Sequence, residues 1–341
     1  MKRQLVIGMK GLRKVLQSDQ GRFAAAPILL IESAGNKPVE EACKHVHFTL
    51  AEQLGFRTVV SNSLGESALP TLQSVEQQQK LAARVGAGIV CAVGSEAAIH
   101  LGKAVSEGMD ELILFPASYP AVMASTMERS LMIDTKEETI VPDTAPAKKE
   151  VTLTDYGITL ALPDKSIIGP PTESSARESA FAILAFCMAR KYQGSPFNGE
   201  IITKLESFLS LVDEQPNDAL EPLLISLSLV GEDMKWGLGR ERRDIPLAIL
   251  ASLLPKIFPN SNPVAAMASL ASTLAQDNNS SELVDLFHRL VGAFGEPSAL
   301  ICNQSVDALM GVVRENQAAW NCLDAGKVAL THCLSAHSLV D

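Results

Sequence analysis

Aromatic side chains are scarce in this sequence: they make up 5% of its 341 residues. Alanine and leucine dominate the second half instead, a composition that favours helical packing over a large sheet in that half. Clustered basic charge is missing too, because the formal net charge is −10 and the pI is about 5.2. Nucleic acids and anionic membranes bind surfaces rich in lysine and arginine, so the sequence argues against both as partners.

Long apolar runs and paired cysteines are also absent. No uncharged apolar stretch reaches the length of about 18 residues that a membrane span needs. The six cysteines form no Cys-x-x-Cys pair and no secretory signal precedes them, so we expect reduced core thiols in a cytoplasmic protein. The basic residues before Asp19 resemble a transit peptide, but the strand pattern of residues 4–7 and the helical pattern of residues 11–16 favour folded structure there.

Between Pro27 and Ala117, short apolar runs alternate with longer amphipathic stretches, the pattern of a parallel sheet with crossover helices. The expected strands cover residues 27–32, 57–61, 88–93 and 111–116. The expected helices between them cover residues 38–54, 72–85 and 96–107. This half of the chain is therefore predicted to be a Rossmann-like α/β domain.

After this alternation the pattern changes twice. Short runs at residues 131–133, 139–141 and 151–155 predict an antiparallel flap over residues 130–162 that ends the first domain. Beyond Pro163 only helical patterns remain, and the helix predicted over residues 176–191 is apolar on nearly every face. Further helices are expected at residues 199–212, 220–230, 246–257, 263–275, 281–292, 305–314 and 325–335. We predict two domains, a Rossmann-like N-terminal α/β domain over residues 1–165 and an all-helical C-terminal domain over residues 166–341.

The most specific motif covers residues 89–104: a buried strand, a turn at Gly94 and Ser95, and a helix that contains Leu-Gly-Lys-Ala at residues 101–104. The free N–H groups and positive dipole end at the start of such a helix suit a pyrophosphate. The segment resembles the Gly-Gly-Gly-Ser segment of the iron-containing alcohol dehydrogenase superfamily, in the form of its maleylacetate reductase branch. The resemblance implies NAD(P) as the cofactor, with Gly94, Ser95 and Lys103 at its phosphates.

Two of the family's glycines are replaced here, by Ser95 and Glu96. A carboxylate in the first turn of a helix is stabilised by the helix dipole, typically by about 0.3 to 1 kcal/mol, so Glu96 can occupy the place of a phosphate. We therefore expect Glu96 to repel the phosphates of a dinucleotide. His100 follows on the same helix, where it could face a phosphate, but we expect it to be exposed to solvent.

A second match covers residues 112–121, which resemble the strand of the reductases that is followed by Pro-Thr-Thr-Tyr-Ala-Gly-Ser-Glu. Pro116 and Tyr119 fit this pattern directly, and Ser118 keeps a hydroxyl group. The resemblance implies that Ser118 and Tyr119 lie near the nicotinamide. A proline-rich turn after a buried strand explains the same residues without any function.

A third match, over residues 151–163, sets the register of the helical domain against the family. In this register two of the family's metal ligands fall on Arg177 and Phe181. A further match, at residues 236–239 and 253–255, places the family's histidines, the catalytic one among them, at Glu232, Trp236 and Pro246. Guanidinium and phenyl groups cannot ligate a metal. No histidine occurs between residues 101 and 287, so we expect neither a bound metal nor a histidine acid in this domain.

Two hypotheses about function follow. In the first, the protein is a metal-independent NAD(P)-linked oxidoreductase of a small alcohol or oxo-acid, with weak or no activity and no assigned catalytic residue. In the second, it is a non-catalytic member of the same fold that binds a partner or a small ligand. The resemblance favours the first hypothesis and suggests a homodimer, whereas the residues at the sites favour the second.

Overall fold

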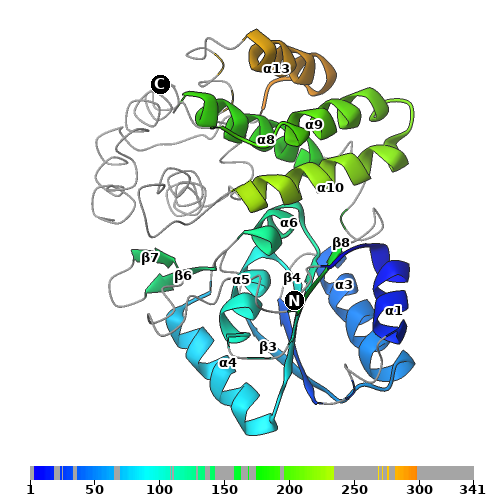
Figure 1. The fold of residues 1–341 in the computed structure, drawn as a ribbon, viewed down its shortest axis with the longest axis vertical. Helices are drawn as coiled ribbons and strands as arrows, with labels where there is room; N and C mark the ends of the chain where they lie inside the picture. Colours follow the sequence, from blue (N-terminus) through cyan, green and yellow to red (C-terminus); the bar gives the residue numbers. More distant parts are fainter. Residues whose placement is uncertain are drawn as a thin grey trace. The chain divides into compact units, whose positions relative to one another are not determined.

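The computed structural model describes residues 4–18, 27–33, 37–64, 70–107, 111–127, 130–134, 139–142, 157–162, 174–192, 196–233 and 281–297, with the single positions 24, 26, 109, 168, 268, 271 and 275. The chain divides into two compact units, Met1–Gly169 and Pro170–Asp341. The first unit is an α/β domain and the second is helical, as the sequence predicts (Figure 1). Within the described part of the chain, no helix combines the length and the apolar character that a membrane crossing requires.

A sheet of six parallel strands forms the centre of the first unit. In spatial order its strands are β1 (Gln4–Ile7), β8 (Gly157–Leu162), β5 (Glu111–Pro116), β4 (Ile89–Gly94), β2 (Ile28–Ser33) and β3 (Thr58–Leu64). Every residue of β4 and β5 is buried, because helices cover a parallel sheet on both faces. The predicted parallel sheet is confirmed.

The helices of this unit lie on both faces of the sheet (Figure 1). Helices α1 (Gly8–Ser18) and α3 (Lys37–Phe48), the latter continued by a π-helical turn at Thr49–Gln53, share a core with Cys91 and Val93 of β4. Helix α5 (Glu96–Val105) packs on the opposite face, because a Cβ atom on Gly102 would overlap Ala92, whose side chain points away from Cys91. Helix α4 (Leu72–Val85) precedes β4 and begins with a capping box at Thr71.

The stretch after β5 differs from its prediction at a short helix, Tyr119–Thr126, which was not predicted, and at one strand. Strands β6 (Leu131–Asp134) and β7 (Thr139–Pro142) form the expected antiparallel pair. Strand β8, however, lies within the main sheet, between β1 and β5 and parallel to both, and not in a flap. A short apolar run looks the same in either place, because local pattern carries no information about which distant strand it will pair with. The expected strand at residues 151–155 lies outside the described residues.

The helical unit is built around α8 (Ser174–Tyr192), which is buried continuously from Ala180 to Met188, as its all-round apolar pattern predicts. Helices α9 (Glu200–Leu211), α10 (Pro216–Asp233) and α13 (Ser281–Phe294) pack with it. The helices expected at residues 246–257, 263–275, 305–314 and 325–335 fall almost entirely outside the described residues.

Candidate functional site

Strands β2 and β4 lie side by side, yet the chain leaves them in opposite directions. β2 leads to β3 at one edge of the sheet, whereas β4 leads to β5 on its other side. In doubly wound sheets such a reversal leaves a crevice outside the carboxyl ends of the two strands, where ligands bind. Ser33 ends β2 and Gly94 ends β4, so the predicted phosphate turn lies at this switch point.

The turn at Gly94 and Ser95 is closed by the end of β2. Gly94 has a φ angle of +126°, and a Cβ atom built on it would overlap the hydroxyl oxygen of Ser33. The same oxygen accepts a hydrogen bond of 2.8 Å from the backbone N–H of Ser95. Glycine is required at position 94 both by the backbone angle and by the lack of space. The turn is therefore tight, and one N–H group at the start of α5 is already bound within the protein.

Glu96 stands in the first turn of α5 and is only 7% exposed. Burial raises the pKa of its carboxyl group to about 8, because the charged form is desolvated. Near neutral pH the group is therefore mostly protonated and can donate a hydrogen bond. The expected repulsion of phosphates is corrected accordingly: Glu96 opposes an anion only as the pH rises towards about 8 and above.

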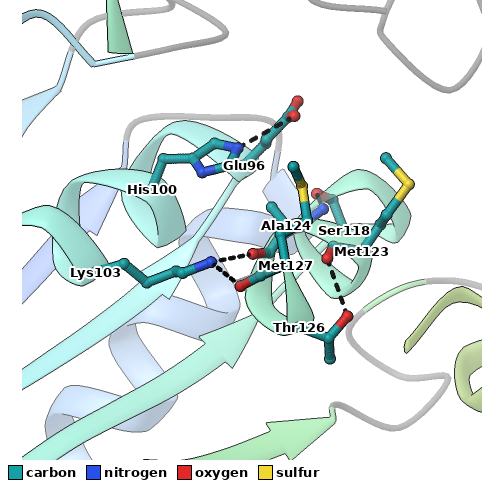
Figure 2. A network of polar contacts seen from close by, with 9 residues as sticks. Glu96, His100, Lys103, Ser118, Met123, Ala124, Thr126 and Met127 are labelled. Atoms are coloured by element: carbon teal, nitrogen blue, oxygen red, sulfur yellow. Dashed lines mark hydrogen bonds and ion pairs between the residues drawn. The ribbon is translucent and has the colours of Figure 1, made fainter. Parts of the chain in front are cut away.

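His100 lies one helical turn after Glu96 and is fully buried, so the expectation of a solvent-exposed imidazole is wrong. Its Nε2 atom lies 3.6 Å from Oε1 of Glu96 (Figure 2). Burial, together with the positive charge of Lys103, lowers the pKa of His100 well below its ordinary value. Both side chains are therefore neutral near pH 7, and their contact is not an ion pair. The exposure was misjudged because every residue of α5 is buried, so the helix has no solvent face.

The ammonium group of Lys103 contacts the end of another helix, α6 (Tyr119–Thr126). Its Nζ atom donates hydrogen bonds to the carbonyl oxygens of Ala124, over 2.9 Å, and Met127, over 2.6 Å (Figure 2). Lys103 belongs to the last turn of α5, about 10 Å along the helix axis from the first turn. Its place at a phosphate stays a prediction, one that would require the side chain to leave these two carbonyl groups.

Ser118 is the N-cap of α6. Its side chain accepts a hydrogen bond of 3.4 Å from the N–H of Ala121. The N–H of Ala117 donates a hydrogen bond of 2.9 Å to the carbonyl oxygen of Gly94, which holds the turn after β5 beside the turn after β4. The structure therefore brings Gly94, Ser95 and Ser118 together at the carboxyl edge of the sheet.

Tyr119 follows Ser118 but belongs to the core. The residue is 2% exposed and its hydroxyl oxygen is buried. A phenol that contacts a nicotinamide must be reachable from the crevice, so this position gives no direct support to the predicted contact. The predicted role of Tyr119 stays a prediction.

Ser33 was not predicted from the sequence, although its hydroxyl group closes the turn. The carbonyl oxygen of Ser33 is also 3.8 Å from the Sγ atom of Cys43, which lies 3.7 Å from the carbonyl oxygen of Val93. Burial, and then the nearby carboxyl group of Glu32, raise the pKa of the Cys43 thiol to about 12, so this thiol is unreactive at neutral pH. The available signal for Ser33 was its place at the end of the strand that precedes the first crossover helix.

In the helical unit, Arg177 and Phe181 lie one turn apart on α8 and both serve packing. Nη1 of Arg177 donates a hydrogen bond of 3.3 Å to the carbonyl oxygen of Phe294, at the end of α13. Phe181 is fully buried, and its ring contacts the ring of Phe287 edge to face with the centroids 5.8 Å apart. Glu232 is exposed near the end of α10.

Several solved structures share this architecture over nearly the whole chain. An iron-containing alcohol dehydrogenase from Thermococcus thioreducens matches with a TM-score of 0.68 and 13% identity, over 100% of this chain and 99% of the other. A sulfoacetaldehyde reductase from Bifidobacterium kashiwanohense, solved in complex with NAD+, matches with a TM-score of 0.67 and 12% identity, over 99% and 97%. A maleylacetate reductase from Agrobacterium tumefaciens matches with a TM-score of 0.61 and 16% identity, over 98% and 95%.

The chain has the two-domain fold of the iron-containing alcohol dehydrogenases. The resemblance drawn from the sequence is thereby confirmed at the level of fold. Comparison with models of known protein families found no match, and comparison with curated protein sequences found no significant one.

Two of the residues that the resemblance places at the family's metal positions do not fit a metal ion. Arg177 and Phe181 cannot ligate, and Trp236 and Pro246 lie outside the described residues. Among the residues that the structure describes, no group of three or more His, Cys, Asp or Glu side chains could hold a metal.

We therefore expect the protein, purified without chelator, to contain no stoichiometric iron, zinc or manganese. Glu232 alone keeps a ligating side chain among the five positions, and one carboxylate does not retain a transition metal. Elemental analysis of the purified protein is the measurement. About one tightly held transition metal per chain would show that ligands lie elsewhere.

Proposed function

We propose that this protein binds NAD(P) at the carboxyl ends of β2 and β4, as a metal-independent, oxidoreductase-type member of the fold with little or no turnover. The observation that carries the proposal is the Gly94–Ser95 turn, which places the start of α5 at the switch point of the sheet. The binding of NAD+ by the sulfoacetaldehyde reductase of the same fold supports it.

The residues of the turn fit an anionic group of this kind. The first N–H groups of a helix have no partners within the helix, and at α5 the side chain of Ser95 makes no capping hydrogen bond. Those N–H groups remain for a phosphate after Ser33 has bound the N–H of Ser95. The protonated carboxyl group of Glu96 adds a donor near neutral pH. Ser118, beside the turn, supplies a hydroxyl group. A bound nicotinamide would supply hydride chemistry.

The second hypothesis, a non-catalytic binding protein, stays open because of the helical unit. Arg177 and Phe181, which stand where the resemblance implies metal ligands, are here used for packing. If the ligand is a dinucleotide, both hypotheses place it at the switch point. They then differ only in whether the protein catalyses a reaction with it.

The direct test is thermal unfolding with NADH and NADPH. A ligand that binds only the native state stabilises it by about 2.7 kcal/mol at one hundred times its Kd, so millimolar dinucleotide is expected to raise Tm by several degrees. Ser95→Asp is the matched variant: aspartate caps a helix as well as serine does, but its charge opposes a phosphate. We expect that variant to keep the Tm of the free protein and to lose the ligand-induced rise. No rise with either cofactor in the wild type would refute the proposal.

A further inference from the structure

Helix α6 carries no charge of its own at either end, although Ser125 and Thr126 donate side-chain hydrogen bonds to the carbonyl oxygens of Val122, over 2.6 Å, and Met123, over 3.1 Å. It is 8 residues long and has no basic residue in its last turn. Its N-terminal capping hydrogen bond, from Ala121 to Ser118, is long at 3.4 Å. The carbonyl groups at a helix end carry partial negative charge and are stabilised by a nearby cation. In α6 that cation comes from a different helix.

Lys103 of α5 supplies it. The residue is 4% exposed, and its ammonium group donates to two carbonyl oxygens at the end of α6, those of Ala124 and Met127. A buried ammonium group is costly unless it is hydrogen-bonded, so these contacts account for its position. The positive charge also acts on His100, whose pKa is lowered by burial and then by this charge.

Helix α5 is itself fixed to the sheet. Gly102, next to Lys103, packs so closely on β4 that a Cβ atom would overlap Ala92. The position of β4 therefore sets the position of Lys103, and Lys103 sets the end of α6. At the other end of α6 stands Ser118, beside the turn of Gly94.

We propose that Lys103 is a positioning residue, whose ammonium group holds the end of α6 and thereby fixes the Ser118 turn against the nicotinamide half of a bound dinucleotide. The inference rests on the proposed function for its ligand. The adenosine diphosphate half would be bound by other elements, because β2, β4 and the start of α5 form the switch point and α6 takes no part in it. Displacement of α6 is thus expected to affect the two halves of the cofactor unequally.

The test compares ADP with NADH as ligands of the wild type and of Lys103→Met, which keeps the length and apolar stem of the side chain but has no charge or donor. Lys80→Met, at an exposed position of α4, is the matched control for loss of one positive charge. For Lys103→Met we expect Kd for NADH to rise about 10-fold and Kd for ADP to change less than about 2-fold. The control should change neither Kd.

An equal rise in both Kd values would place Lys103 at a phosphate and overturn the positioning role. A fall in Tm with both Kd values unchanged would show that Lys103 only stabilises the fold, and would also overturn the positioning role.

Hydrogen exchange gives a second measurement that needs no variant and no ligand. The backbone amides of Ser125, Thr126 and Met127 in the wild type should exchange at least about 10-fold more slowly than those of a fraying helix end. Unprotected amides there would contradict the proposal. A wild type that binds neither ADP nor NADH would instead refute the cofactor site.

Discussion

Mixed with NADH or NADPH and with maleylacetate, short aldehydes or simple ketones, the purified protein is expected to turn over at least about 10⁴-fold more slowly than an ordinary relative. Reduction of a carbonyl group needs a proton donor, or a positive charge, beside the developing alkoxide. General acid catalysis contributes roughly 10²-fold to 10⁴-fold, and electrostatic stabilisation roughly 10²-fold to 10³-fold. The resemblance to the family assigns these tasks to a metal and a histidine. This chain has no histidine between residues 101 and 287.

The structure adds two physical reasons for a slow reaction. The guanidinium group of Arg177 is engaged with the carbonyl oxygen of Phe294, so it is not placed to substitute for the charge of a metal. The hydroxyl oxygen of Tyr119, the phenol that the resemblance places near the nicotinamide, is buried and out of easy reach of a substrate.

The assay is the loss of NADH absorbance, with a maleylacetate reductase measured under the same conditions as the positive control. Tyr119→Phe is the informative variant, because it removes only the hydroxyl group. A turnover of about 1 s⁻¹ or more that disappears in Tyr119→Phe would contradict the expectation and would identify tyrosine as the acid.

Glu96→Gln is expected to change the pH dependence of stability. Burial raises the pKa of Glu96 in the folded protein from 4.5 to about 8. The folded state therefore binds this proton more tightly than the unfolded state does, so the group destabilises the fold progressively as the pH rises from about 4.5 to about 8. Below that interval both states are protonated and the penalty vanishes. Above it the penalty is complete.

Glutamine has a similar shape and no proton to lose. The free energy of unfolding of Glu96→Gln, relative to wild type, should therefore increase between pH 5 and pH 9 by roughly 2 to 5 kcal/mol. Chemical unfolding at a series of pH values measures this difference. Glu76→Gln, at an exposed position of α4, is the control for loss of one carboxyl group. Parallel pH profiles for wild type and Glu96→Gln would mean that Glu96 is ionised throughout and that its burial costs nothing.

The sequence predicts those features of the fold that depend on local pattern. The strands β2, β4 and β5 are buried and read as short apolar runs between helices, and the edge strand β3 is half-buried; the positions of all four are confirmed to within a few residues. The exception is β8, whose partners β1 and β5 lie far away in the chain. Nothing in its own residues distinguishes a strand within the main sheet from one of a flap.

In the candidate site, too, the sequence predicts what depends on local pattern and misses what depends on distant partners. Gly94 and Ser95 follow directly from a strand, a turn and a helix start, whereas Ser118 was predicted from the resemblance alone. Ser33 was missed because its hydrogen bond to Ser95 joins positions 62 residues apart. The partners of Lys103 are backbone carbonyl groups, which every residue possesses, so no sequence pattern marks them.

The place of β8 in the sheet has a consequence for the synthesis of the protein. β1 is made first, but its partner in the sheet is β8, which begins at Gly157. Ribosomes add about 5 to 20 residues per second, so the first strand waits roughly 8 to 30 s for its neighbour. During that time β2, β3, β4 and β5 can pair among themselves, and β1 can join only when β8 has closed the gap beside β5. The strand of this sheet that is synthesised earliest is thus among the last to be paired.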